Sequence, residues 1–161
     1  MTKGTLHVRP GDVEVAGAGT VLATLGLGSC VAVALHDPGS ELGALCHAML
    51  PAPLPGRSAV SVGRFASLVV PAQVEKLESA GADRSRLRAW LVGGATMFSI
   101  FAGDQESVGS RNVRAARAAL ESLGIPVVAE DVGGTYGRSV YFTVGEGTIE
   151  VRSVQNRKIV L

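Results

Sequence analysis

Two cysteines and a histidine stand close together in the first third of this chain: Cys30, Cys46 and His47. A cysteine thiol becomes a strong nucleophile when an imidazole takes its proton, so a Cys–His pair is suited to attack on a carbonyl carbon. The run GLGSC places Gly28 and Ser29 directly before Cys30. A glycine turn of this kind exposes backbone N–H groups that can hold an oxyanion. These residue types indicate acyl-transfer chemistry, with Cys30 as the candidate nucleophile.

Whether the thiol and the imidazole can meet depends on a predicted β-hairpin. The tetrapeptide DPGS at residues 37–40 has Pro and Gly at its central positions, which is typical of a type II turn. With Pro38 and Gly39 as the tip, Cys30 lies opposite His47 on one face of the hairpin. Type II turns are not favoured in two-residue hairpins, so a longer loop or a shifted register stays open. A slip by one residue would exchange the two faces.

The two cysteines are predicted to have different roles. Successive strand residues point to opposite faces, so Cys46 lies on the face away from Cys30. Its neighbours on that face are apolar, namely Val31, Val33, Leu35, Leu42 and Ala44. Cys30 shares its face with the small residues Ala32 and Ala34, which leave room beside a thiol. We interpret Cys46 as a buried structural residue and Cys30 as the reactive one.

Other kinds of site fit the sequence less well. A zinc site built from both cysteines and His47 would need adjacent strand residues to converge, which the pleat prevents. The run GLGSCV lacks the third glycine of a dinucleotide-binding loop, and GGTYGRS lacks the lysine of a phosphate-binding loop. The glycine pairs 93–94 and 133–134 are therefore predicted to form tight turns. We also predict that His7, His36, Arg111, Arg114 and Arg117 are exposed to solvent. The sequence predicts neither a metal nor a cofactor.

Composition limits the classes of function. The chain has 161 residues, of which 47% are hydrophobic, and this suits one domain, residues 1–161, with its own core. A formal net charge of +1 gives no electrostatic surface for nucleic acid or for an anionic membrane. No apolar run is long enough to span a membrane, and the N-terminus has no signal-peptide pattern. Two cysteines without such a signal are expected to be reduced thiols, so we predict a soluble cytoplasmic protein.

The elements that must position these residues are mostly short strands. Strands are predicted at 21–25, 31–35, 44–50, 87–98, 127–130, 139–144, 148–154 and 158–161, where β-rich runs are bounded by turn residues. The spacing of apolar residues predicts helices over 61–80 and 110–123. Pro71 interrupts the first helix, so we expect a kink or a late start there. The pattern predicts an α+β fold, with helices packed on mixed or antiparallel sheets.

Five longer motifs follow one another along the chain: TLGLGSCVAVALHDP, GALCHAMLP, GGATMF, VGSRN and AEDVGGTYGRSVYF. In this order they resemble the CheD family of bacterial chemotaxis proteins, the chemoreceptor glutamine deamidases, over about residues 24–142. The resemblance implies a cysteine hydrolase that converts receptor glutamines to glutamates and releases ammonia. The family's nucleophile matches Cys30, its histidine matches His47 and its third polar residue matches Thr24.

The resemblance also implies a fold and partners. The fold is a layered α/β sandwich with largely antiparallel sheets, similar to that of toxin deamidases of the cytotoxic necrotizing factor type. The partners are methyl-accepting chemotaxis receptors, as substrates, and a CheC-type phosphatase, with no nucleic acid and no membrane insertion.

The chain departs from the family pattern at Phe65 and Ser67, where Tyr and Asp are frequent, at Pro71, and at Cys46 before the histidine. These departures keep a second interpretation open, a non-catalytic module that binds CheC or receptor helices. A third is hydrolysis of glutamyl methyl esters, because the same acyl-enzyme is reachable from either substrate.

Overall fold

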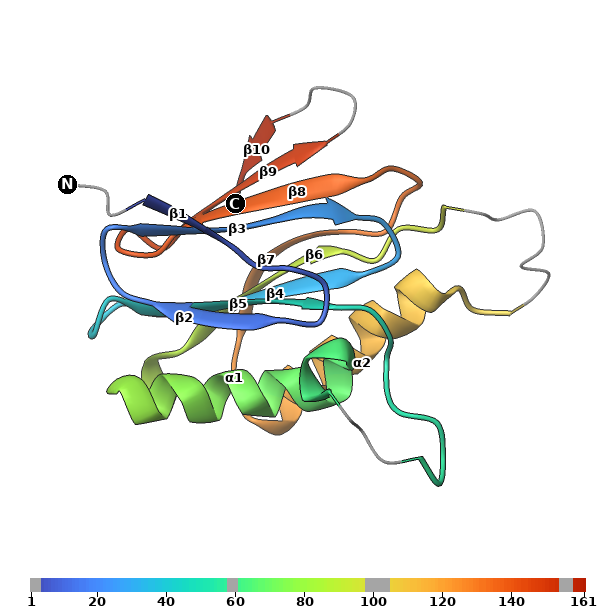
Figure 1. Ribbon diagram of the computed structural model, residues 1–161, viewed down its shortest axis with the longest axis horizontal. Coiled ribbons are helices and arrows are strands. Elements are labelled where there is room, and N and C mark those ends of the chain that lie inside the picture. Colours follow the sequence, from blue (N-terminus) through green and yellow to red (C-terminus); the bar gives the residue numbers. More distant parts are fainter. Residues whose placement is uncertain (1–3, 58–60, 98–104, 154–157) are drawn as a thin grey trace.

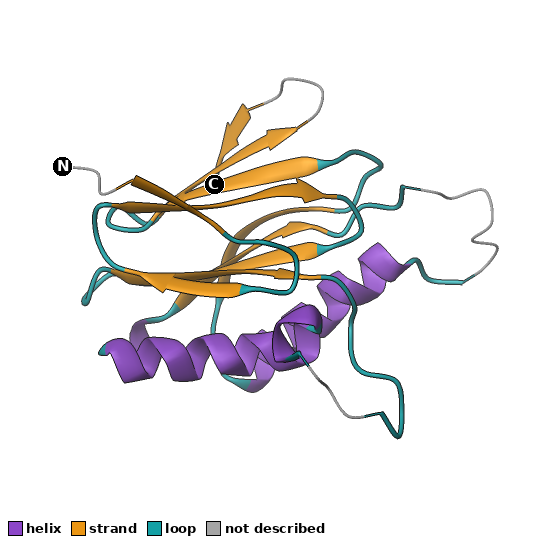
Figure 2. Cartoon of the chain, in the orientation of Figure 1, coloured by secondary structure: helices purple, strands orange, loops and turns teal. Residues whose placement is uncertain are grey.

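In the described part of the chain, three layers build the fold: one β-sheet, a second β-sheet, and a pair of helices (Figures 1 and 2). The computed structural model describes residues 4–57, 61–97, 105–153 and 158–161. Within these ranges the helices cover only the face of the second sheet that points away from the first. No helix there has the length and apolar character of a membrane span.

Among the described residues, each sheet has five strands. Sheet A has the order β1-β3-β8-β9-β10, and sheet B has the order β2-β5-β4-β6-β7. The strands of sheet A are β1 (Gly4–His7), β3 (Thr20–Leu27), β8 (Arg138–Thr143), β9 (Thr148–Ser153) and β10 (Lys158–Val160). Those of sheet B are β2 (Val13–Ala16), β5 (Leu42–Ala48), β4 (Val31–Asp37), β6 (Arg88–Gly93) and β7 (Val127–Val132). The helices are α1 (Ala66–Ala80) and α2 (Val108–Ser122), with short 3-10 turns η1 (Val62–Arg64) and η2 (Arg84–Arg86).

The sheets are mixed and mainly antiparallel. Of the pairings between described strands, β1 with β3 and β6 with β7 are parallel, and the other six are antiparallel. The predicted α+β class is therefore confirmed, although β1 and β2 were not predicted from the sequence.

Strand β4 is buried along its whole length because it lies between two cores. Val31, Val33 and Leu35 pack in the core between sheet B and the helices. Ala32 and Ala34, which alternate with them, pack in the core between the two sheets. A strand covered on both faces has no polar side, which explains the continuous apolar run in its sequence.

The β4–β5 hairpin differs from its predicted register by two residues. Ala32, not Cys30, lies opposite His47, and Val33 lies opposite Cys46. The predicted pairing of Cys30 directly with His47 is therefore wrong. A shift of two residues nevertheless keeps every side chain on its predicted face, because the side chains of a strand alternate with a period of two.

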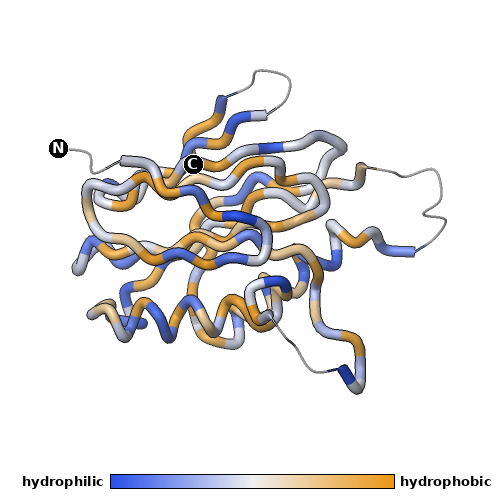
Figure 3. Tube along the Cα trace, in the orientation of Figure 1, coloured by the Kyte–Doolittle hydropathy of each residue, from blue (hydrophilic) through white to orange (hydrophobic). Residues whose placement is uncertain are grey.

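The helices lie close to their predicted positions. Helix α1 begins at Ala66, so the expected late start at Pro71 is wrong, and Pro71 stands inside the helix. The helix ends at Gly81, whose φ of 113° suits a glycine. Helix α2 begins after Ser107, whose side chain accepts a hydrogen bond from the amide of Ser110. The alternation of hydrophobic and hydrophilic residues along α1 can be followed in Figure 3.

The exposure predicted for the two outer histidines is half right. His7 is exposed, but His36 is only 5% exposed. Strand β4 continues to Asp37, beyond its predicted end, so His36 turns into the core between the sheets. There its ring lies 5.9 Å from that of Phe142 and 6.4 Å from that of Trp90, between ring centroids.

Candidate active site

One buried hydrogen bond joins the two sheets at the predicted site. The Oγ1 atom of Thr24, on β3, lies 2.7 Å from Nδ1 of His47, on β5, and both residues are 1% exposed. The Thr24 hydroxyl also donates to the Val8 carbonyl over 2.6 Å. A carbonyl can only accept, so the hydroxyl hydrogen is used there, and the Thr24 oxygen accepts the Nδ1–H of His47. This arrangement selects the tautomer whose Nε2 carries a lone pair and can act as a base.

Cys30 lies on the same side of sheet B as His47. Ala32, two residues after Cys30, is directly opposite His47, so Cys30 is its diagonal neighbour. Such neighbours are about 7–8 Å apart, within reach of a long side chain. The Cys30 side chain is partly buried against the core between the sheets. The structure describes both residues and records no hydrogen bond between them. It thus brings Thr24, His47 and Cys30 to one region between the sheets.

The loop before β4 is held by its carbonyl groups. The carbonyls of Gly28 and Cys30 accept hydrogen bonds from the amides of Ala95 and Gly94, over 2.9 Å and 2.8 Å. The Ser29 carbonyl accepts from a side chain on α2 over 2.8 Å. Within the described ranges, the amides of Ser29 and Cys30 donate to no backbone carbonyl in a turn or loop. These two amides are therefore candidate donors for an oxyanion beside the thiol.

A β-bulge separates Thr24 from this loop. The register between β3 and β8 shifts between Thr24 and Leu27, and Gly26 has a φ of 69°, which favours glycine. Bulges bend a strand and are common next to active sites. Here the bulge lies in the last residues of β3, shortly before the chain crosses from sheet A to Cys30, which directly precedes β4.

Burial favours the uncharged forms of both Cys30 and His47. Burial raises the pKa of the Cys30 thiol above 9.0, and a hydrogen bond from its own backbone N–H opposes this in part. Burial also lowers the pKa of His47 below 6.5, because the imidazolium is disfavoured away from water. Both shifts favour the neutral thiol and the neutral imidazole at pH 7.

Cys46 has the structural role predicted for it. It is 0% exposed and packs in the core between sheet B and the helices. Burial raises the pKa of its thiol to about 12. It has neither the access nor the ionisation that a nucleophile needs.

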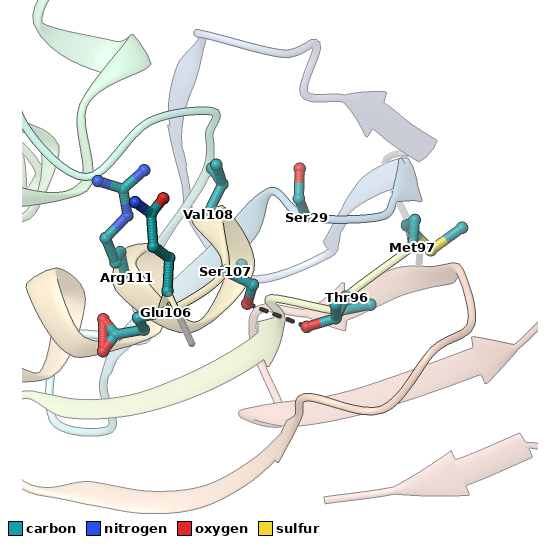
Figure 4. Close-up of a pocket in the computed structure, with 10 residues that line it drawn as sticks. Ser29, Thr96, Met97, Glu106, Ser107, Val108 and Arg111 are labelled. Carbon is teal, nitrogen blue, oxygen red and sulfur yellow. Dashed lines mark hydrogen bonds between the residues drawn. The ribbon is translucent and has the colours of Figure 1, made fainter. Parts of the chain in front are cut away.

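A surface pocket of about 380 Å³ opens beside the loop that carries Cys30 (Figure 4). Its lining includes Ser29, apolar Met97 and Val108, and charged Glu106 and Arg111. Figure 4 shows a hydrogen bond between two of its lining residues, from Thr96 Oγ1 to Ser107 Oγ over 2.9 Å. Arg111 is exposed as predicted, but it borders this pocket and not a featureless surface.

Asn112 is the polar residue near the site that the sequence analysis did not single out. Its side chain is 0% exposed and reaches the loop before Cys30. A signal was present, since Asn112 lies on the predicted helix beside Val113, on the stripe that continues to Ala116 and Leu120. A polar residue on the buried side of an amphipathic helix needs a partner, and that partner is a site to look for.

Comparisons with known proteins identify the family. Among solved structures, hypothetical protein YfiH of Bacillus licheniformis has a TM-score of 0.48 and 15% identity, covering 74% of this chain and 49% of its own. The chain thus spans about half of that protein. It is 36% identical over 157 residues to "Probable chemoreceptor glutamine deamidase CheD" of Clostridium novyi, covering 96% of each chain.

A second relative has a higher identity. The "Probable chemoreceptor glutamine deamidase CheD 3" of Geobacter sulfurreducens is 47% identical over 146 residues, covering 89% of this chain and 90% of that protein. Residues 49–153 match the family described as CheD chemotactic sensory transduction. On this match and these relatives, the chain belongs to the CheD family.

Proposed function

We propose that this protein is a chemoreceptor glutamine deamidase in which Cys30 is the nucleophile, His47 the general base and acid, and Thr24 the residue that orients His47. The observation that carries the proposal is the buried Thr24–His47 hydrogen bond, with Cys30 on the same side of sheet B. The names of its relatives support the substrate class, a glutamine side chain of a chemoreceptor.

The first half of the reaction forms a thioester. Nε2 of His47 takes the thiol proton as the Cys30 sulfur bonds to the carbonyl carbon of the glutamine side chain. The amides of Ser29 and Cys30, in the turn that starts at Gly28, hold the oxyanion. When the intermediate collapses, the C–N bond breaks and His47 gives its proton to the departing ammonia.

The second half returns the enzyme to its resting state. Water attacks the thioester carbon while Nε2 of His47 takes one of its protons. The C–S bond breaks, the product is a glutamate side chain, and His47 returns the proton to the Cys30 sulfur. The imidazolium forms twice in this cycle, and each time the Thr24 oxygen holds its Nδ1–H.

The proposed enzyme also has a location, a substrate and a regulator. We place it in the cytoplasm as one domain, residues 1–161, since its two cysteines are both free thiols, which suit a reducing compartment. Its substrates are methyl-accepting chemotaxis receptors, as the relatives' names support, and a CheC-type phosphatase is its regulator. The pocket at Ser29 and Met97 is the proposed entrance for the receptor glutamine. The likeness to cytotoxic necrotizing factor-type toxins stays a prediction.

Peptide mass spectrometry of a receptor cytoplasmic fragment tests the activity and the nucleophile together. We expect an amide-to-acid mass shift at defined glutamines with the native protein, and none with Cys30→Ala. Cys46→Ala is the matched control: it removes a thiol that is 0% exposed, and it should retain the activity once folding is verified.

The opposite outcome has a clear meaning. If the native protein shifts no glutamine on several receptors from its own cell but binds CheC, it is a binding module and not a deamidase. If Cys30→Ala retains the mass shift, the assignment of the nucleophile is wrong.

A further inference from the structure

The amide of Asn112 bridges the two chain segments that carry the proposed nucleophile and base. Its Nδ2 atom donates to the Ser29 carbonyl over 2.8 Å and to the Met49 carbonyl over 3.1 Å. Ser29 directly precedes Cys30, and Met49 follows His47 by two residues. A carboxamide nitrogen has two hydrogens, so each segment receives one of them.

The bridge is buried and rigidly mounted. The Asn112 side chain is 0% exposed, and it projects from the second turn of α2. Gly109, three residues earlier on α2, lies so close to the segment after β6 that an added Cβ would meet the Ala95 carbonyl oxygen at 2.3 Å. This contact fixes the start of the helix against the segment whose amides hold the carbonyls of Gly28 and Cys30.

Backbone pairing alone does not hold the two segments at this point. The β4–β5 ladder ends at the pair of Val31 with Ala48. Cys30 and Met49 lie just beyond it. Their backbone groups bond to Gly94 and Arg64 instead, and among the described residues no backbone hydrogen bond joins Cys30 to Met49. The side chain of Asn112 reaches this point from α2, and its two hydrogen bonds link the two segments where the β4–β5 backbone pairing has ended.

We propose that Asn112 is a positioning residue that sets the separation of Cys30 and His47 by tying together the ends of β4 and β5. The inference rests on the proposed function for the roles of Cys30 and His47. Asn112 itself donates both hydrogens to backbone carbonyls, so it acts through the two loops and not on the substrate.

Gln73 supplies a matched control for ordinary loss of stability. It is also 0% exposed, on α1, and its Nε2 donates to the Val33 carbonyl over 2.9 Å. The side-chain oxygens of Gln73 and Asn112 both lack a hydrogen-bond partner among the described residues. Val33 lies in the middle of β4, away from the point where the β4–β5 pairing ends, so Gln73→Glu introduces the same buried carboxyl without touching either loop.

The experiment compares Asn112→Asp with Gln73→Glu in the full chain. An Asp carboxylate has no hydrogen to donate and repels both carbonyls, and a protonated Asp can donate to only one. We expect Asn112→Asp to lower kcat on a receptor fragment about hundredfold, the loss that a displacement of about 1 Å can cause. KM should change far less, because Asn112 itself is not among the residues that line the pocket. Gln73→Glu should lower thermal stability to a similar degree and leave kcat close to that of the native protein.

A second readout needs no receptor and so separates this inference from the proposed deamidation. The rate at which iodoacetamide labels Cys30 is measured by peptide mass spectrometry at pH values from 5 to 10. In the native protein and in Gln73→Glu, we expect an inflection where His47 titrates, and in Asn112→Asp we expect it to be lost. The inference is wrong if the labelling profile of Asn112→Asp matches that of the native protein, or if both variants lower kcat equally at a temperature where both are folded. Should Asn112→Asp not fold, Asn112→Ser retains one donor and takes its place under the same criteria.

Discussion

At the scale of single residues, the role proposed for His47 depends on the Val8 carbonyl, a group outside the proposed catalytic residues. The Val8 carbonyl occupies the Thr24 hydroxyl hydrogen over 2.6 Å, and this leaves the Thr24 oxygen only as an acceptor. His47 must therefore carry its hydrogen on Nδ1. If Thr24 donated to the ring instead, the hydrogen of the neutral His47 would lie on Nε2. Nε2 is the nitrogen that is proposed to accept the proton of the Cys30 thiol.

Replacing Thr24 tests this hydrogen-bond order. Thr24→Val keeps the shape of the side chain but removes its oxygen, so Nδ1 of His47 loses its partner. We expect kcat to fall about hundredfold, within the range that a positioned acid–base group contributes. Thr24→Ser retains the hydroxyl and should retain most of the activity, while its stability falls slightly for the lost methyl. Steady-state kinetics on a receptor fragment decides, and equal activity in the Val and Ser variants would remove Thr24 from the mechanism.

At the scale of elements, one carboxylate closes the β4–β5 hairpin and ties it to η2. Asp37 accepts hydrogen bonds from the amides of Gly39 and Asp83, at 2.9 Å and 2.8 Å, and from the Ser40 hydroxyl at 2.9 Å. The Arg86 guanidinium adds two more bonds, at 2.7 Å and 2.9 Å. Together these donors, with Arg86 foremost, hold the pKa of Asp37 well below its ordinary value of 3.8.

Asp37→Asn should destabilise the fold in a pH-dependent way. The amide cannot accept all these bonds, and we expect the free energy of unfolding at pH 7 to fall by about 2 kcal/mol. The folded pKa is lowered, so the native carboxylate contributes its full stability above its unfolded pKa, near pH 4, and loses it as the pH falls below that value. Urea unfolding of both proteins at pH 7 and pH 3 should show a smaller difference at pH 3. A difference that is the same at both pH values would mean that the charge of Asp37 is not what stabilises the hairpin.

The same hairpin shows where sequence reasoning succeeds and where it stops. Alternation along β4 and β5 was enough to place Cys30 and His47 on one face and Cys46 on the other. The register was not predictable, because the loop is shaped by Asp83 and Arg86, which lie far along the chain from Asp37. Strands β1 and β2 were missed because they are exposed or half-buried and lack a strong apolar pattern. For Asn112, only the fold shows which two carbonyls it reaches.

At the scale of the whole molecule, the proposed site is a property of how the two sheets pack. Sheet A supplies Thr24, and sheet B supplies His47 and the thiol of Cys30. The separation of the sheets is set by their shared core, in which Phe142, Leu22 and Leu45 are all 0% exposed. A change in that packing should therefore alter the geometry of the proposed site without replacing Thr24, His47 or Cys30.

Gly43 is the place to test this dependence. It lies on β5, on the same face as His47, and an added Cβ would meet two ring carbons of Phe142 at 2.7 Å. Phe142 pairs with Leu22 on β3, two residues before Thr24, so a wedge at Gly43 pushes β3 away from β5. We expect Gly43→Ala to cost about 1–3 kcal/mol of stability, as overpacking does, and to lower kcat at temperatures where the protein is still folded.

Gly17→Ala is the matched control for the Gly43 variant. Its added Cβ would meet only Leu42 Cδ2, at an ordinary contact distance of 3.9 Å. Thermal unfolding and steady-state kinetics on the native protein, Gly43→Ala and Gly17→Ala then distinguish two explanations. If Gly43→Ala loses stability but keeps the kcat of the native protein, the Thr24–His47 geometry is held locally by β3 and β5. If Gly43→Ala lowers both kcat and stability while Gly17→Ala changes neither, the packing of the two sheets sets the distance between Thr24 and His47.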